Sequence, residues 1–309
     1  MPLTVTDYLL VTTEGTAAAV DTASPAGAEG PVALARGVRL EAVDAELAER
    51  LLLACEFRGE GWAPHRQVGV AQAFVRTIDA TDANQQHLYA WDQDQAIFTA
   101  LALSRFVRPH AIACDYAVRR VQSDDAPERL VPHDAAEARV AYRIDDGSRN
   151  WLDADEAEQL RALLTAFRGP PHLPGRVARA LWLAELMVRE RYLEDALPLL
   201  VAGLEALLKV GRAHLTNQFT QRSAALAGVL SIALTETIAH DAYDDRSGLV
   251  HGALVDLTQI AERTRFITNV DLLQQTLRAA VRRAIEQPAF AALFASDAMI
   301  LGQWPVAPR

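Results

Sequence analysis

One stretch of the sequence combines side chains that could handle a phosphodiester. Residues 243 to 252 read Y-D-D-R-S-G-L-V-H-G, which places Arg246 five residues before His251. A guanidinium binds a phosphate through a fixed fork of N–H donors, and an imidazole accepts or donates protons near neutral pH. This pair could hold a phosphate and move a proton during metal-independent cleavage of RNA.

The spacing of the two residues constrains how they could work together. Five helical steps of about 100° leave the two side chains about 140° apart around a helix axis. One copy of the stretch therefore does not aim Arg246 and His251 at one atom. Two copies related by a two-fold axis could build a shared site from both chains, so we expect a homodimer.

Further residues upstream of this stretch form an ordered set on predicted helices. The set consists of Leu204-Glu205-Ala206-Leu207-Leu208, Gln221-Arg222, Arg246 followed by Ser247, and His251 followed by Gly252. This order resembles the Apea-like branch of the HEPN family, with its L-E-x-L-L helix, its helix-borne arginine and its R-x4-H motif. The resemblance covers about residues 174 to 290, which is less than half of the chain.

The resemblance implies a fold, a partner and an activity. HEPN domains are small all-α bundles, and their ribonuclease members place the Arg and His at a dimer interface. By this resemblance Arg246 would bind the phosphate and His251 would act as general acid or base, with Glu205, Arg222 and Ser247 in support. The family also implies a toxin or anti-phage defence setting, in which residues 1 to 150 would sense a trigger or select the substrate.

Structural roles for the same residues stay open. Arg246 could pair with Asp241, Asp244 or Asp245, and His251 could cap or pack a helix. Asp245 and its neighbours lower the local positive potential, although they could also hold the arginine in place. Glu205 needs a partner if it is buried, and Arg222 on the following helix is a candidate. In this alternative the bundle is a non-catalytic dimerisation or ligand-sensing module that recruits a regulatory protein.

Composition limits the classes of partner. The 309 residues carry a net charge of −10, and half of them are hydrophobic. This balance is typical of a globular protein and argues against a broad surface that coats nucleic acid. We expect a local RNA contact and no DNA partner. The two cysteines lie in apolar surroundings, the N-terminus lacks a signal-peptide pattern, and Glu205 interrupts the longest apolar helix. A cytoplasmic protein away from the membrane is expected.

Motifs for other chemistry are missing from the sequence. The eight histidines form no H-x-x-x-H, H-E-x-x-H or Cys/His cluster, so no metal site is expected. No Gly-rich nucleotide loop and no G-x-S-x-G sequence is present, so we expect no cofactor.

Periodicity and turn signals predict an α+β chain. Residues 1 to 150 read as a mixed α/β domain, with strands predicted at 3–12, 32–42, 67–78, 112–121 and 138–144 and helices at 45–57 and from about 92 to 107. Residues 151 to 173 read as a helix and linker, because Asp153 and Glu156 have capping-box spacing and Gly169-Pro170-Pro171 breaks the chain. Residues 174 to 309 read as a HEPN-like helical bundle, with helices at about 175–190, 194–210, 214–231, 234–254, 269–286 and 288–295.

Overall fold

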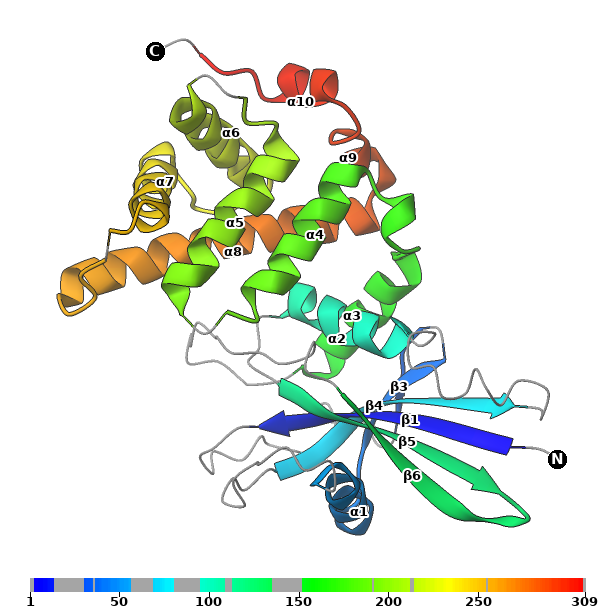
Figure 1. Ribbon diagram of the computed structural model, residues 1–309. Helices are drawn as coiled ribbons and strands as arrows, with labels where there is room; N and C mark the ends of the chain where they lie inside the picture. Colours follow the sequence, from blue (N-terminus) through cyan, green and yellow to red (C-terminus); the bar gives the residue numbers. More distant parts are fainter. Residues whose placement is uncertain are drawn as a thin grey trace. The chain divides into compact units, whose positions relative to one another are not determined.

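The computed structural model has an α+β fold, with an antiparallel sheet in the N-terminal half and mostly helices after it (Figure 1). The structure describes residues 3–13, 31–35, 37–56, 69–80, 95–108, 113–134, 152–190, 192–211, 214–253 and 255–307. The chain divides into two compact units at Thr165/Ala166, inside the segment expected to join two domains. The predicted strand at 138–144 lies outside the described residues.

The first unit is built on a six-stranded antiparallel sheet with the order β2-β3-β4-β1-β5-β6. Helix α1 packs on one face, where Leu51 joins Tyr8, Leu10, Val75 and Val118 in a buried cluster. Helix α2 packs against β3 and β4. The strands are β1 Leu3–Thr13, β2 Val32–Ala33, β3 Val38–Ala42, β4 Gly69–Ala80, β5 Ala113–Ser123 and β6 Ala126–Asp134, and the helices are α1 Ala45–Glu56, α2 Gln95–Val107 and α3 Ala154–Ala166.

An ion pair lies in the middle of this sheet. Asp7 on β1 stands directly opposite Arg119 on β5, and Arg119 donates to both carboxylate oxygens over 2.6 and 2.7 Å. The two side chains are 0% and 4% exposed. The bidentate geometry recovers part of the cost of removing both charges from water.

Two strand predictions needed correction. Gly37, with φ of +74°, and the bonds between Leu34 and Val38 split the expected strand at 32–42 into β2 and β3. Strand β6 was missed because Pro127 and Pro132 argue against a strand. It lies at the edge of the sheet, where a proline costs fewer ladder hydrogen bonds than in a central strand.

The predicted capping box at the start of α3 is confirmed. The backbone N–H of Glu156 donates to Asp153 Oδ1 over 2.8 Å, and the N–H of Asp153 donates to Glu156 Oε2 over 2.9 Å. Two N–H groups at the start of the helix are thereby satisfied.

The second unit is a helical bundle around α8, which crosses α4 and α5 and extends beyond α7 in Figure 1. Along α8, Phe266, Val270, Leu273 and Leu277 are buried at helical spacing, so this apolar stripe forms the centre of the bundle. The helices are α4 Gly175–Met187, α5 Leu193–Leu208, α6 Leu215–Val229, α7 Glu236–Val250, α8 Ile260–Glu286, α9 Pro288–Ala292 and α10 Asp297–Gln303, and η5 Pro170–His172 precedes them. No helix among the described residues has the length and apolar character to cross a membrane.

Candidate functional site

Arg246 and His251 both belong to the last turns of α7. Arg246 is half-buried, whereas His251 is exposed and forms the C-cap of the helix. The N–H of Ala253 donates to Gly248 O and that of Gly252 to Leu249 O. With Gly252 at φ of +86°, this is a Schellman motif, so the glycine after the histidine has a backbone role.

The carboxylates next to Arg246 have other partners. Arg265 on α8 binds both oxygens of Asp245, over 2.8 and 3.0 Å, and this bond raises the pKa of Arg265. Asp244 lies 3.1 Å from His240 Nδ1. Within the described parts of the chain, neither these carboxylates nor any other forms an ion pair with Arg246. The alternative in which Arg246 pairs with Asp241, Asp244 or Asp245 is therefore not seen in this chain.

The guanidinium of Arg246 lies over an aromatic ring. Its Cζ is 5.7 Å from the centroid of Tyr243, a distance at which a cation is attracted to the ring face. Nε of Arg246 is fully buried and has no hydrogen-bond acceptor among the described residues. The two Nη atoms are not in this class of buried atoms without a partner. Since no described residue accepts a bond from them either, both keep some contact with solvent.

Tyr243 is itself held from two sides. Its hydroxyl donates to Glu205 Oε1 on α5 over 3.2 Å, and its ring lies 4.9 Å from that of Phe219 on α6. Burial is the main cause that raises the pKa of Tyr243; the charge of Glu205 and the bond to it add to the increase, and Arg246 opposes it. Sequence reasoning missed Tyr243, although its position three residues before Arg246 places both on one helix face.

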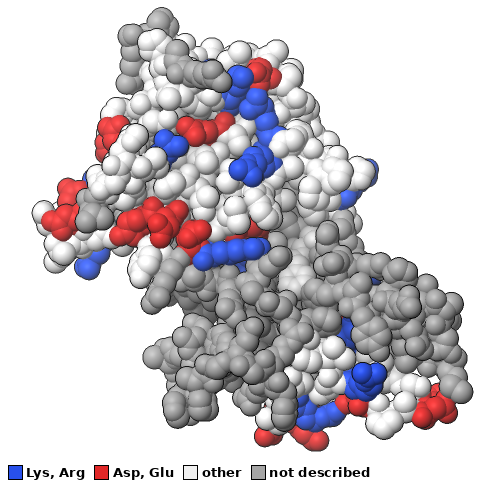
Figure 2. Space-filling view, in the orientation of Figure 1, with Lys and Arg blue, Asp and Glu red and all other residues white. Residues whose placement is uncertain are grey.

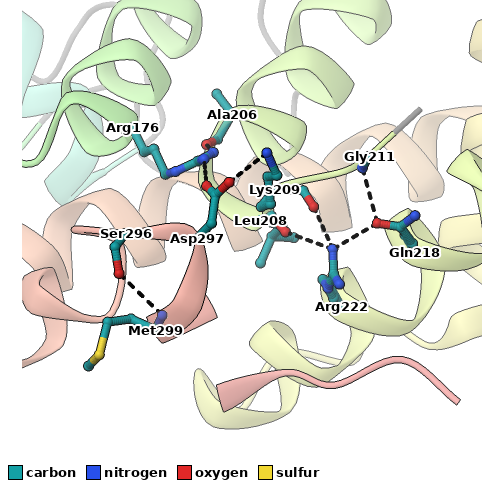
Figure 3. A network of polar contacts seen from close by, with 10 residues as sticks. All are labelled: Arg176, Ala206, Leu208, Lys209, Gly211, Gln218, Arg222, Ser296, Asp297 and Met299. Atoms are coloured by element: carbon teal, nitrogen blue, oxygen red, sulfur yellow. Dashed lines mark hydrogen bonds and ion pairs between the residues drawn. The ribbon is translucent and has the colours of Figure 1, made fainter. Parts of the chain in front are cut away.

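Arg222 does not pair with Glu205, contrary to expectation. It is buried, and it donates to Leu208 O, Lys209 O and Gln218 Oε1 (Figure 3) and to Trp304 O. Burial lowers its pKa. Arg222 therefore satisfies the free carbonyls at the end of α5, where a cation also suits the helix dipole.

The same helix end is held from a second direction. Figure 3 shows Arg176 donating to Ala206 O and pairing with Asp297 at the start of α10. Lys209 Nζ lies 2.6 Å from the other oxygen of Asp297. These contacts tie α4, α5 and α10 together, so this network stabilises the bundle and is separate from the Arg246 contacts.

Residues 304 to 307 pack along α6. Asn217 and Gln221 both donate to Ala307 O over 3.3 Å, and the N–H of Ala307 donates to Gln221 Oε1 over 2.8 Å. Trp304 is buried and stacks on Phe294. Among the described residues, the side chains of α6 that bond this segment all bond its main chain.

Ser247 contributes to the end of α7 through its backbone. Its carbonyl accepts the N–H of His251 over 3.2 Å, and its side chain makes no hydrogen bond to a described residue. In the described ranges, no three His, Cys, Asp or Glu side chains gather as metal ligands.

Charge on one face of the molecule lies in small groups of both signs. On the face drawn in Figure 2, the described Lys and Arg side chains lie in small groups near Asp and Glu. A face of this kind does not attract nucleic acid broadly.

Two exposed apolar side chains belong to the end of α7 and the start of α8. Val250 is 56% exposed and Ile260, at the start of α8, is 71% exposed. By helical geometry Val250 projects about 40° from Arg246 and about 100° from His251, inside the sector between them. Comparisons with protein-family models, curated proteins and solved structures give no match, so these residues carry the functional argument.

Proposed function

We propose that this protein is a metal-independent endoribonuclease of the HEPN type, whose site is completed by Arg246 of one copy and His251 of a second. The observation that carries this proposal is the engagement of Asp245 by Arg265, because it leaves the solvent-facing nitrogens of Arg246 available for a phosphate. His251 is exposed at the helix end, where an RNA strand can reach it.

The chemistry follows from the two groups. The 2′-oxygen of a ribose attacks the adjacent phosphorus and the bond to the 5′-oxygen breaks. The imidazole of His251 takes the 2′-hydroxyl proton or gives one to the leaving oxygen, while the guanidinium of Arg246 stabilises the charge that grows on the phosphoryl oxygens. Since DNA lacks the 2′-hydroxyl, it is not a substrate.

A second copy solves the geometric problem. In one chain the two side chains diverge by about 140°, and the exposed Val250 lies between them. A two-fold contact that buries Val250 and Ile260 would bring Arg246 of each copy toward His251 of the other.

The test uses mixed RNA in EDTA with the parent protein and with His251→Ala and Arg246→Ala. We expect cleavage by the parent and a loss of about a hundredfold in each variant, the scale of one general acid–base group. His172→Ala and Arg263→Ala are matched controls that remove exposed side chains of the same unit and keep the parental rate. An inactive parent, or controls that lose as much as the site variants, would contradict the proposal.

Mixing the two inactive variants tests whether the site is shared. In a heterodimer of Arg246→Ala and His251→Ala chains, one of the two sites is intact if each site uses both copies. Random exchange should therefore restore about a quarter of the parental sites. If both residues act within one chain, mixing restores nothing.

The exposed Val250 and Ile260 also favour a second candidate function. If the two side chains form one contiguous surface, that surface is typical of an interaction site, and the bundle is then a non-catalytic module that dimerises or recruits a regulatory protein. In the toxin or anti-phage setting that the resemblance implies, such a module would respond to a trigger. If the parent protein cleaves no RNA under either resting or triggering conditions, that result supports this candidate.

A further inference from the structure

The support beneath Arg246 spans three helices. Tyr243 comes from α7, Phe219 from α6 and Glu205 from α5. Tyr243 is only 6% exposed, so little of its ring is open to solvent. A ring fixed in this way is a rigid surface for the more mobile side chain above it.

An arginine that is ordered by such a surface binds a phosphate at a lower entropic cost. Its long side chain loses rotamer entropy when it is held in one conformation, and a side chain that is ordered before binding avoids much of that cost. Here the ring attracts the guanidinium, whereas the buried Nε lacks an acceptor among the described residues. This orientation leaves the Nη1–Nη2 edge as the one that meets an anion.

We propose that Tyr243 is the positioning residue of the site: its ring holds Arg246 so that the Nη1–Nη2 edge points outward to grip a phosphodiester oxygen end-on. This inference rests on the proposed function, because it takes Arg246 as the phosphate-binding residue. The hydroxyl of Tyr243 fixes the plane of the ring through Glu205, and Phe219 limits its tilt.

Two substitutions separate the ring from the hydroxyl. Tyr243→Phe keeps the ring, and Tyr243→Met removes the ring while it keeps most of the side-chain volume. Tyr192→Met is the matched control, since Tyr192 is an exposed tyrosine of the same unit. Circular dichroism establishes that each variant is folded.

The first measurement is independent of cleavage. Proton NMR of the Arg246 side chain should show ring-current shifts in the parent and in Tyr243→Phe, and these shifts should be lost in Tyr243→Met. The second is binding of a labelled 2′-O-methyl oligoribonucleotide, which cannot be cleaved. We expect Tyr243→Met to weaken its affinity about tenfold, and Tyr243→Phe to stay within about threefold of the parent.

The outcomes distinguish the two proposals. If Tyr243→Met keeps the Arg246 shifts and the parental affinity, Tyr243 does not position Arg246, and the proposed function is unaffected. If Tyr243→Phe loses both the shifts and the affinity, the hydroxyl and not the ring orients the arginine, which also overturns the inference. If the parent protein neither binds nor cleaves RNA, the proposed function fails, and the NMR comparison still shows whether the ring holds Arg246.

Discussion

Arg265 donates to both carboxylate oxygens of Asp245, through Nη1 over 2.8 Å and Nη2 over 3.0 Å. The pair joins α7 to α8 and engages the carboxylate that directly precedes Arg246 in the sequence. The charge beside the candidate phosphate-binding residue is thus compensated from a neighbouring helix.

Replacing Arg265 by Ala should weaken RNA binding about threefold to tenfold, because the charge of Asp245 then acts on Arg246 without compensation. The free energy of unfolding should fall by about 1 kcal/mol, the scale of a partly exposed ion pair. Binding titrations and urea unfolding measure the two effects. Arg263→Ala removes an exposed charge from the same helix; equal binding by both variants would contradict the prediction.

The ionisation of Tyr243 should report its two charged neighbours. Because its pKa is raised from 10.0, the protonated phenol stabilises the folded state fully below pH 10, and this contribution is lost as the pH rises through the raised pKa. Glu205→Gln should lower the pKa and Arg246→Ala should raise it further. Titration of carbon-labelled tyrosine by NMR checks both directions. In Tyr243→Phe, the free energy of unfolding should fall less at high pH, because this side chain cannot ionise.

Asn in place of Asp7 should destabilise the first unit strongly. It leaves the buried guanidinium of Arg119 without its carboxylate, and breaking a buried pair costs about 3–5 kcal/mol. Urea unfolding measures the loss, with Glu41→Gln as the control because the Arg39–Glu41 pair is only partly buried. The double substitution Asp7→Leu with Arg119→Met should cost less than Asp7→Asn, and a larger cost would show that packing dominates.

Ala in place of Gly252 should strain the end of α7. Its φ of +86° is in the left-handed region, which costs a residue with a Cβ about 1–2 kcal/mol. Gly228→Ala is a suitable control, since it lies in α6 with no atom within 4 Å of the added Cβ; it should be neutral or slightly stabilising. Thermal unfolding compares the two, and equal effects would argue against strain at Gly252.

Helix α8 shows which parts of the fold the sequence could predict. The expected helix began at residue 269, whereas α8 begins at Ile260. The buried stripe starts at Phe266, and the turns before it contain exposed polar residues such as Arg263 and Thr264. Apolar periodicity reveals the helix only where it meets the core. The short α10 was missed for the same reason, because Ile300 is its one buried residue.

For the candidate site too, the sequence could predict some features and not others. Local spacing identified Arg246 and His251, and the glycine after the histidine marks the end of the helix. The partners of Glu205 and Arg222 depend on how α5, α6 and α7 pack, and no local pattern specifies the side chains that meet across helices. The sequence therefore suggested an ion pair between two residues that instead bind Tyr243 and the carbonyls of α5.

The hydrogen bonds from α6 to Ala307 determine which amino acids position 307 can accept. Asn217 and Gln221 form hydrogen bonds to the backbone N–H and C=O of residue 307 and none to its side chain. Nineteen amino acids supply the N–H and C=O that these amides require, and proline lacks the N–H. Position 307 should accept almost any residue in a saturation library, with proline as the exception.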